Sequence, residues 1–479
     1  MLESGTDDTG TPEGGRERRA DVVPLRDATR VWFQISLQTF GGPAGQIAVM
    51  HRTLVEEKRW IGHHRFLYAL NYCMLLPGPE AQQLATYTGW LLNGTRGGLI
   101  AGTLFVLPGM VAMLLLSVIY VWLGDTQVVS AIFAGLAPAV IAIVIQAVYR
   151  VAKRSLIHPV LVALAAAAFL SLTVLAIPFP VVVLGAGVVG WLAGRWIPAL
   201  RQPGREDHMS TTAPPLISDQ LLQQDLPSPR RFLATLVIGL ALWWAPIAAA
   251  ALLVQSTNVL VEEGLFFSGA AVVTFGGAYA GLAYVAQRAV NIYGWLSPGE
   301  MVRGLALAET TPGPLIMVVQ FVAFLGAFRY PGTMSPWLAA VLGSLLTTWV
   351  TFVPCLLFIF LGAPYVERLR NHEQLTAALS GITAAVVGVI ASLASYFAVH
   401  TLFATTHRFV YGPIRIDLPM VSSWQPGSVT LTVIALVPGL LGAVERTAYA
   451  CRLHPHWRYY RRGSCDAALG RPHVSARPT

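Results

Sequence analysis

Charged side chains are scarce in this chain. Only 12% of its 479 residues are Asp, Glu, Lys or Arg, whereas soluble proteins carry about 25%. Because so few charges cannot cover a water-exposed surface, the composition excludes a soluble multidomain fold. It also excludes a disordered chain and a nucleic-acid-binding protein, although the net charge is +8. Such an excess of basic residues is typical of loops that flank membrane spans.

Cysteine is also rare, and the motifs of several enzyme classes are missing from the sequence. The cysteines are too few and too scattered for a disulfide scaffold or a metal site. They are Cys73, Cys355, Cys451 and Cys465. There is no Walker loop, no Asp-rich motif and no His-x-x-His pair, so we expect no metal, no cofactor and no ATP-driven pumping. A membrane enzyme acting on a lipid phosphate stays an alternative, but it lacks motif support.

Apolar segments make up most of the chain instead. Hydrophobic residues account for 55% of the sequence, and segments long enough to cross a bilayer recur between short charged loops. The sequence therefore predicts an all-α polytopic membrane protein with about 12 apolar segments. These segments are 31–50, 66–92, 97–123, 127–149, 156–176, 179–196, 232–255, 264–287, 300–328, 335–362, 373–402 and 430–450.

The placement of Lys and Arg predicts how these segments are oriented. Basic residues gather in the loop 150–154, in the Pro- and Gln-rich linker 198–231 and in the tail 451–479. Because basic loops stay on the cytosolic side, we expect a multi-pass protein of the cytoplasmic (inner) membrane with both termini in the cytosol. Residues 1–30 lack the apolar core of a signal peptide and are interpreted as a cytosolic tail. The loop 403–429 has room for a small extramembrane hairpin.

One basic loop, 51–65, conflicts with this orientation if both neighbouring segments cross the bilayer fully. Both neighbours, 31–50 and 66–92, contain helix-breaking residues. We favour broken or re-entrant segments, because they return the loop to the cytosol. Full crossing stays the alternative.

The two halves of the chain repeat each other at a nearly constant offset. Thr39-Phe40-Gly41-Gly42 recurs as Thr274-Phe275-Gly276-Gly277, Pro77-Gly78-Pro79 recurs as Pro312-Gly313-Pro314 at the same offset of 235, and Pro108 matches Pro354 at an offset of 246. This register predicts a duplication, with repeat one at 31–197 and repeat two at 264–450. A single apolar segment, 232–255, lies between them. One crossing between two copies inverts the second, an arrangement common in secondary transporters.

The recurring motifs place helix breaks inside apolar segments. Two prolines around a glycine cannot continue a helix, but proline suits the start of a new one, so Pro79 and Pro314 are expected to begin half-helices. The N-terminus of a half-helix offers free N–H groups to an anion. Glycines let the backbone approach that anion closely. The alternative is that these residues are only packing kinks.

The same residues resemble a known family. Phe40-Gly41-Gly42-Pro43-Ala44, Arg59-Trp60 and Leu76-Pro77-Gly78-Pro79, followed by a degenerate second copy, are similar to the chromate ion transporter (CHR) family in its long two-domain form. The resemblance covers about 31–450. It implies export of chromate, with sulfate as a similar dianion, coupled to the proton gradient. The sequence departs from the family pattern at two places. One is Gln46, and the other is Ala278-Tyr279, which follows the second Gly-Gly pair.

Candidate substrate-binding residues follow from the breaks. They are Gly41, Gly42, Pro43, Gln46, Pro77, Gly78, Pro79, Gly276, Gly277, Thr310, Thr311, Pro312, Gly313 and Pro314. The two threonines have hydroxyls that either cap the following half-helix or donate to an oxyanion. Gln46 either contacts substrate or bonds a neighbouring helix.

Two carboxylates lie beside the breaks and are candidates for proton coupling. Glu80 follows Pro79 directly, and Glu309 precedes the second break. Carboxylates at membrane depth are costly and usually functional. We expect ionised Glu80 to compete with the dianion for the half-helix amides. Its counterpart in repeat two, Leu315, leaves that terminus open. Simple satisfaction of the helix end is the alternative.

Four basic residues flank the broken segments and are candidates for electrostatic attraction of the dianion. They are Lys58, Arg59, Arg288 and Arg303. Orientation charge explains the first two equally well, and pairing with Glu300 is the alternative for Arg303. The expected partners are thus chromate or sulfate and the lipid bilayer, without nucleic acid, and the sequence is compatible with a homodimer. A channel or another inorganic-anion permease are further alternatives.

Overall fold

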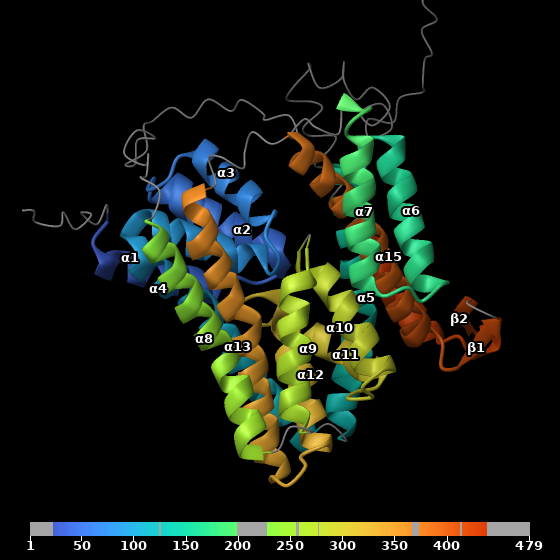
Figure 1. Ribbon diagram of the computed structural model, residues 1–479. Helices are drawn as coiled ribbons and strands as arrows, with labels where there is room; N and C mark the ends of the chain where they lie inside the picture. Colours follow the sequence, from blue (N-terminus) through green and yellow to red (C-terminus); the bar gives the residue numbers. More distant parts are fainter. Residues whose placement is uncertain are drawn as a thin grey trace, which may run out of the picture.

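The computed structural model describes residues 23–123, 126–198, 228–254, 258–275, 277–365, 373–411 and 414–437. Almost all of these residues are helical (Figure 1). Five helices in the described part are long and apolar enough to cross a membrane, and several shorter apolar helices accompany them. Within the described residues, the predicted apolar segments thus form five long helices and several short ones.

The first half of the chain begins with short helices and ends with long ones. Its elements are α1 (Leu25–Gln38), α2 (Gly42–His51), the π-helical segment η1 (Arg52–Glu57), α3 (His63–Cys73), α4 (Glu80–Leu123), α5 (Gln127–Ser155), α6 (Pro159–Thr173) and α7 (Phe179–Ala193). Within α4 the backbone leaves the helical region at Asn93 and Gly94, so α4 is two helices joined at a kink. Helix α1 begins before the expected start of repeat one.

The second half follows the connecting helix α8 (Pro229–Val254). Its elements are α9 (Val259–Val273), α10 (Ala278–Asn291), α11 (Pro298–Thr310), η4 (Leu315–Met317), α12 (Val318–Arg329), α13 (Pro336–Gly362), η5 (Ala363–Tyr365), α15 (Glu373–Leu402), β1 (Thr406–Tyr411), β2 (Ile414–Pro419) and η6 (Val421–Ser423). The antiparallel β1–β2 pair confirms the hairpin expected at 403–429. The last described apolar helix spans Pro426–Val437, and the rest of 430–450 lies outside the described residues.

The element order of the first half returns in the second. At the offset that relates the two Pro-Gly-Pro motifs, α1, α2 and α3 coincide with α9, α10 and α11, and the start of α4 coincides with η4. At the larger offset that relates Pro108 to Pro354, α5 coincides with α15. The larger offset also brings α6 onto the β1–β2 hairpin, so here the two halves differ in secondary structure.

The short helices of the two halves lie at different levels of the molecule, with α10 and α11 near its middle (Figure 1). In Figure 1, α2 and α3 lie toward the end at which α7 ends and α15 begins, whereas the α12–α13 connection lies at the other end. We call these the linker end and the far end. The segments 31–50, 66–92, 264–287 and 300–328 each contain two helices with a break between them, as favoured for the first two.

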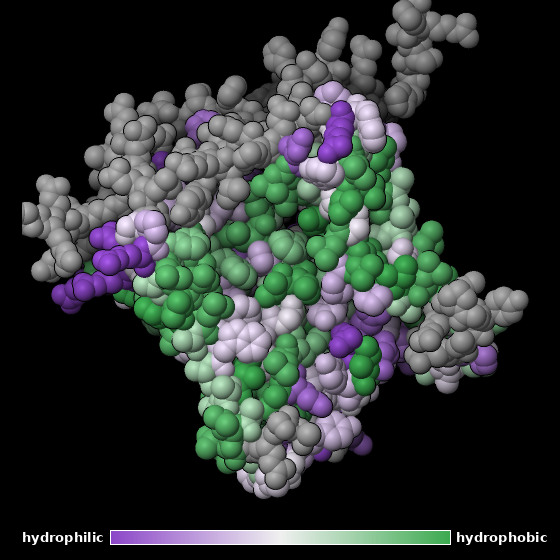
Figure 2. Space-filling view, viewed as in Figure 1, coloured by the Kyte–Doolittle hydropathy of each residue, from purple (hydrophilic) through white to green (hydrophobic). Residues whose placement is uncertain are grey.

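The hairpins of the two halves pack differently. Helix α10 packs against α15, and α11 packs against α5 and α15. Helices α1, α2 and α3 pack mainly against α4 and do not contact α5 or α15 to a comparable extent in the described chain. Helix α12 is buried at the centre. Apolar residues cover both flanks of the face in Figure 2.

Helix α9 begins before the predicted segment 264–287. The Asn258 side chain caps α9, so the helix already begins at Val259 and includes Glu263. The Glu263 side chain is fully buried, and its carboxylate lies against Gly326 of α12 and Gly343 of α13. The absence of side chains at both glycines provides the room, which an apolar pattern cannot reveal.

Candidate functional site

The two Pro-Gly-Pro breaks are joined to the opposite half of the chain by matching hydrogen bonds. Gly78 donates its backbone N–H to the Thr274 carbonyl at 2.8 Å, and Gly313 donates to the Thr39 carbonyl at 3.0 Å. The two donors are equivalent positions of the repeats, and so are the two acceptors. Because proline has no N–H, the glycine holds the one amide donor of each motif. Both donors are therefore used inside the protein.

The same glycines also pack against matching positions. A Cβ on Gly313 would lie 3.1 Å from the Gly109 Cα, and a Cβ on Gly78 would lie 2.5 Å from the Cys355 Sγ. Gly109 and Cys355 are equivalent positions, each directly after one of the matching prolines in α4 and α13. Both glycines of the breaks have positive φ angles, 113° at Gly78 and 104° at Gly313. The breaks are thus held closely between long helices, and the helices after them begin at Glu80 and Leu315, directly after the expected prolines.

The Gly-Gly breaks bring each half next to a carboxylate. A Cβ on Gly277 would lie 2.9 Å from Glu80 Oε1. A Cβ on Gly42 would lie 3.5 Å from the Tyr279 hydroxyl and 3.8 Å from Glu309 Oε2. Gly41 and Gly42 have φ angles of 77° and 75°, a region that favours glycine. Gly276 lies outside the described residues.

The two carboxylates differ in their partners. Glu309 accepts a hydrogen bond of 2.8 Å from the Tyr279 hydroxyl. Glu80 lies beside its own backbone N–H at the start of α4, and its Oε2 is buried without a partner among the described residues. A buried carboxylate oxygen without a donor is costly. This geometry is consistent with a role for Glu80 that involves its protonation.

Two residues near the breaks were not expected from the sequence. Tyr279 stands where repeat one has Ala44, and it bonds Glu309 across two helices. Arg150, near the end of α5, lies within electrostatic range of both the Glu309 carboxylate and the Tyr279 hydroxyl. The sequence presented Arg150 only as a basic loop residue. Its proximity depends on how α5 packs beside α11.

Gln46 connects the two halves directly. Its Nε2 donates to the Gly313 carbonyl at 2.6 Å, and the side chain is buried. Gln46 therefore forms a hydrogen bond to the break of the other half. Of its two alternatives, contact with substrate or a bond to a neighbouring segment, the structure shows the second. Pro43 occupies the first turn of α2, where its missing N–H leaves no donor unpaired.

In this structure the two threonines do not cap the following helix, which was one of their two alternative roles. Thr310 donates its hydroxyl to the carbonyls of Ala306 and Leu307, and Thr311 donates to Ala308. Both hydroxyls thus bond the preceding helix α11 and not the helix that follows the break. Threonine in a last helical turn can bond back to a carbonyl three or four residues earlier, and this local geometry prevails.

The basic candidates lie away from the breaks. Lys58 and Arg59 are exposed in the loop after η1. Arg288 lies over the Tyr293 ring at 5.6 Å. The pairing alternative for Arg303 is also wrong: Glu300 pairs with Arg329, and Arg303 donates to the Tyr120 hydroxyl at 3.2 Å.

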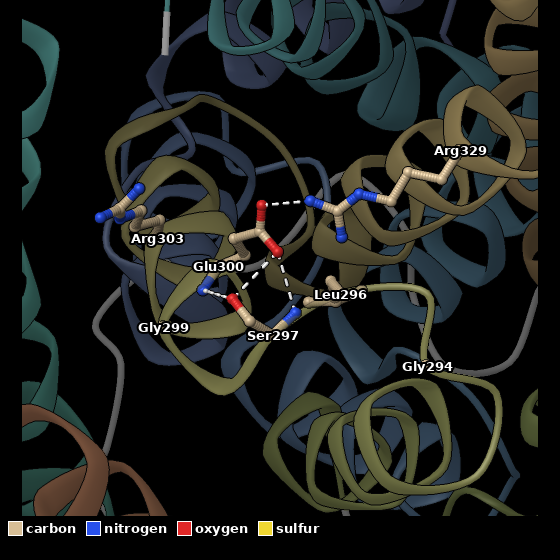
Figure 3. Close-up of a pocket in the computed structure, with 7 residues that line it drawn as sticks. All are labelled: Gly294, Leu296, Ser297, Gly299, Glu300, Arg303 and Arg329. Atoms are coloured by element: carbon tan, nitrogen blue, oxygen red, sulfur yellow. Dashed lines mark hydrogen bonds and ion pairs between the residues drawn. The ribbon is translucent and has the colours of Figure 1, made fainter. Parts of the chain in front are cut away.

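Figure 3 shows that the Arg303 guanidinium points away from Glu300, while Arg329 reaches it from α12. These residues line an open surface pocket of about 590 Å³. The pocket lies at the start of α11, about three turns from the break at its other end. The Glu300 carboxylate also accepts from the Ser297 N–H, which closes a capping box. The amides of Ser297 and Glu300 at this helix start are therefore already occupied.

The two Gly-Gly breaks differ in exposure at two matching positions. Phe40 and Ala44 are exposed, whereas their counterparts Phe275 and Tyr279 are half-buried and buried. A cavity of about 20 Å³ lies against Gly78, Pro79 and Thr274. It has room for about one water, so a five-atom oxyanion fits there only after the halves move relative to each other.

Comparison with known proteins identifies relatives along most of the chain. A family model described as Chromate transporter matches residues 26–191 and 261–446. The chain is 28% identical to a chromate transport protein of Cupriavidus metallidurans over 79% of this chain and 84% of that protein. It is 29% identical to a chromate transport protein of Pseudomonas aeruginosa over 86% of this chain and 90% of that protein.

A third relative, a probable chromate transport protein of Synechococcus elongatus, is 26% identical over 87% of this chain and 95% of that protein. No solved structure matches the chain. The two regions that the family model matches begin at positions 26 and 261, which differ by the same offset that relates the two breaks.

Proposed function

Because the chain belongs to the chromate transporter family, whose members are transporters and not enzymes, we propose that it is a secondary active transporter that exports chromate. The long apolar helices identify a multi-pass membrane protein. We place it in the cytoplasmic membrane with both termini, the tail 1–30, the linker 198–231 and the tail 451–479 in the cytosol. The linker end then faces the cytosol.

The observation that carries the proposal is the paired bond between the breaks. Gly78 and Gly313 each donate to a threonine carbonyl of the opposite half. Such reciprocity is what a two-fold axis in the membrane plane would produce, and it supports two repeats of inverted topology. In this interpretation α8 is the single crossing that inverts the second copy.

We propose that the oxyanion binds beside the first Gly-Gly pair. There Gly41 is exposed, Gly42 faces Tyr279, and Arg150 lies within electrostatic range. Helices α2 and α10 begin beside the Gly-Gly breaks without a side-chain cap, so their first-turn amides are the proposed anion donors. The four oxygens of a tetrahedral dianion can accept hydrogen bonds from several N–H donors, and its charge is attracted by one cation. Sulfate has the same charge and shape, so we include it as a second substrate.

Proton coupling is assigned to Glu80 and Glu309. Two carboxylates beside an anion site repel a dianion when they are ionised, because like charges interact strongly where water is excluded. Protonation of one carboxylate therefore favours dianion binding. Glu80 is the stronger candidate, because one of its oxygens has no partner among the described residues.

Uptake of labelled chromate into everted membrane vesicles tests the function. We expect uptake above that of vesicles without the protein, competition by excess sulfate, and a response to an imposed pH gradient. The Glu80→Gln variant should lose most of the pH response. Absence of chromate uptake with uptake of another inorganic anion would favour a different permease, and lipid turnover without ion movement would favour an enzyme. Crosslinking in the membrane would separate a monomer from a homodimer.

A further inference from the structure

A groove of about 370 Å³ lies between α10 and α15, with the α6–α7 connection along its edge. Its polar lining consists of Thr173, Gln287, Asn291, Ser392, Ser395 and His400. None of its lining residues is Asp, Glu, Lys or Arg. These helix segments lie toward the far end of the molecule (Figure 1). In Figure 2 hydrophilic residues interrupt the apolar surface where α10 and α11 lie, between the apolar flanks.

The corresponding turn of the first half has a different charge. At the offset that aligns α5 with α15, Tyr396, Val399 and His400 of α15 correspond to Arg150, Lys153 and Arg154 of α5. Those three basic residues are exposed, and α5 ends at the linker end. The last turns of α5 therefore carry three cations, whereas the equivalent turns of α15 carry a tyrosine, a valine and a histidine.

We infer that the groove between α10 and α15 is the release path of the transported oxyanion, and that the basic turn of α5 is its entrance. This inference rests on the proposed function. Cations raise the local concentration of a dianion at the entrance. At the release end, hydroxyls and amides can replace hydration water without holding the dianion, which a pathway needs if its cargo is to leave.

Helix α10 forms the wall between the groove and the breaks. Ala283 and Ala286 line the groove, and Val285 lines the small cavity beside Gly78. The groove residues Thr173 and Ser392 are already joined by a hydrogen bond of 3.0 Å. Movement of α10 away from α15 would therefore open the breaks toward the groove, with polar groups ready to receive an anion.

Cysteine accessibility tests the groove directly. Ser392→Cys, Arg154→Cys and Leu170→Cys would be made in a chain with Cys451→Ser and Cys465→Ser, since Cys73 and Cys355 are buried. Leu170 is 53% exposed on α6 and serves as the lipid-facing control. Each variant is treated with a charged, membrane-impermeant thiol reagent from either side, and with a neutral maleimide.

We expect the charged reagent to modify Ser392→Cys from the periplasmic side and Arg154→Cys from the cytosolic side. Leu170→Cys should react with the neutral maleimide alone, and added chromate should slow the reaction of Ser392→Cys. If Ser392→Cys behaves like Leu170→Cys, or reacts from the same side as Arg154→Cys, the inference is overturned. Labelling requires no transport, so an accessible groove in a protein that moves no chromate would contradict only the proposed function.

A charge placed in the groove provides a second test. Tyr396→Arg puts in α15 the residue that α5 has at Arg150, and it should slow chromate turnover by retaining the anion. Tyr396→Gln is the neutral match that separates the loss of the ring from the gain of charge. Equal turnover of the two variants would contradict a release path at this position.

Discussion

The two halves of the molecule share a backbone plan and differ in what they expose. At the first Gly-Gly break Phe40 and Ala44 are exposed, and its hairpins pack mainly on α4. At the second break the counterparts Phe275 and Tyr279 are half-buried and buried, and α10 and α11 pack on α5 and α15. Two such halves can exchange these arrangements only if one moves relative to the other. We interpret this asymmetry as one of the two states of the proposed alternating-access cycle.

The comparison also separates framework from function. Positions that match at the offset, such as Gly78 with Gly313, hold the breaks together. Positions that differ, such as Glu80 with Leu315 and Arg150 with Tyr396, carry the charges. In the proposed mechanism, the symmetric framework would let the site face either end, and the unmatched charges would give transport a direction.

The largest effect is expected from breaking the tighter crossing. Gly78→Ala places a Cβ 2.5 Å from Cys355 Sγ at a positive φ, which should lower the free energy of unfolding by about 2–4 kcal/mol. Thermal unfolding in detergent measures this loss. Cys355→Gly, which copies Gly109 of the first half, should restore part of it in the double variant.

Gly41→Ala is the matched control for that prediction. It has a similar positive φ, but its Cβ would meet nothing within 4 Å, so we expect only about 1 kcal/mol of backbone strain. Equal losses at Gly41 and Gly78, or no recovery with Cys355→Gly, would show that the crossing does not determine stability.

The unmatched carboxylate should have the next largest effect. Glu80→Gln removes a titratable group that the second half lacks, and we expect the pH dependence of chromate transport to flatten, with a rate change of about tenfold. Leu315→Glu would place the carboxylate in both halves and should weaken chromate binding at neutral pH. Transport with an unaltered pH profile in Glu80→Gln would exclude this carboxylate from coupling.

Arg150→Gln should have a moderate effect on apparent affinity. Loss of one partly screened cation near the site costs about 1 kcal/mol, which raises KM for chromate about fivefold at low salt. The difference from the parent should shrink as ionic strength rises, while kcat changes less. Arg154→Gln, one turn further from the breaks, should change KM less. A KM shift that is insensitive to salt would indicate a structural role.

The smallest effect is expected from His63, which lies outside the membrane-spanning segments. Burial, and then the neighbouring His51 and His64, lower the pKa of His63 below 6.5. A lowered pKa favours the neutral ring in the fold, so this contribution to stability is present above the unfolded pKa and is lost as pH falls through the folded value. The His63→Gln variant should therefore lose less Tm than the parent between about pH 7 and about pH 5. A steeper loss would contradict the sign.

Sequence periodicity and punctuation predicted much of the framework. The offset of Pro-Gly-Pro and Gly-Gly motifs gave the positions of the breaks and the correspondence of α1 to α9, because proline and glycine act on the backbone locally. The hairpin at 403–429 followed from its prolines. The replacement of α6 by β1–β2 did not, since register alone does not reveal that a helix has become a hairpin.

Contacts between distant segments could not be derived in this way. The partners of Gly78, Gln46 and Arg150 lie in other helices, and they depend on how hairpins from the two halves meet. Burial of Glu263 depends on two glycines in α12 and α13. The bonding of the threonines before Pro312 did not follow from the sequence, because a hydroxyl can bond backward as readily as forward along the chain.

Helix α8 has a consequence for how the chain could be rebuilt. Only 11% of its most apolar stretch is buried in the protein, so most of its side chains would touch lipid. A few side chains still fix it in place, such as Trp243, which donates to the Ser268 hydroxyl. If the two halves are inverted copies, an unrelated single-pass anchor that keeps these contacts should preserve assembly, whereas a two-pass insert of equal hydrophobicity would leave the second half facing the wrong compartment.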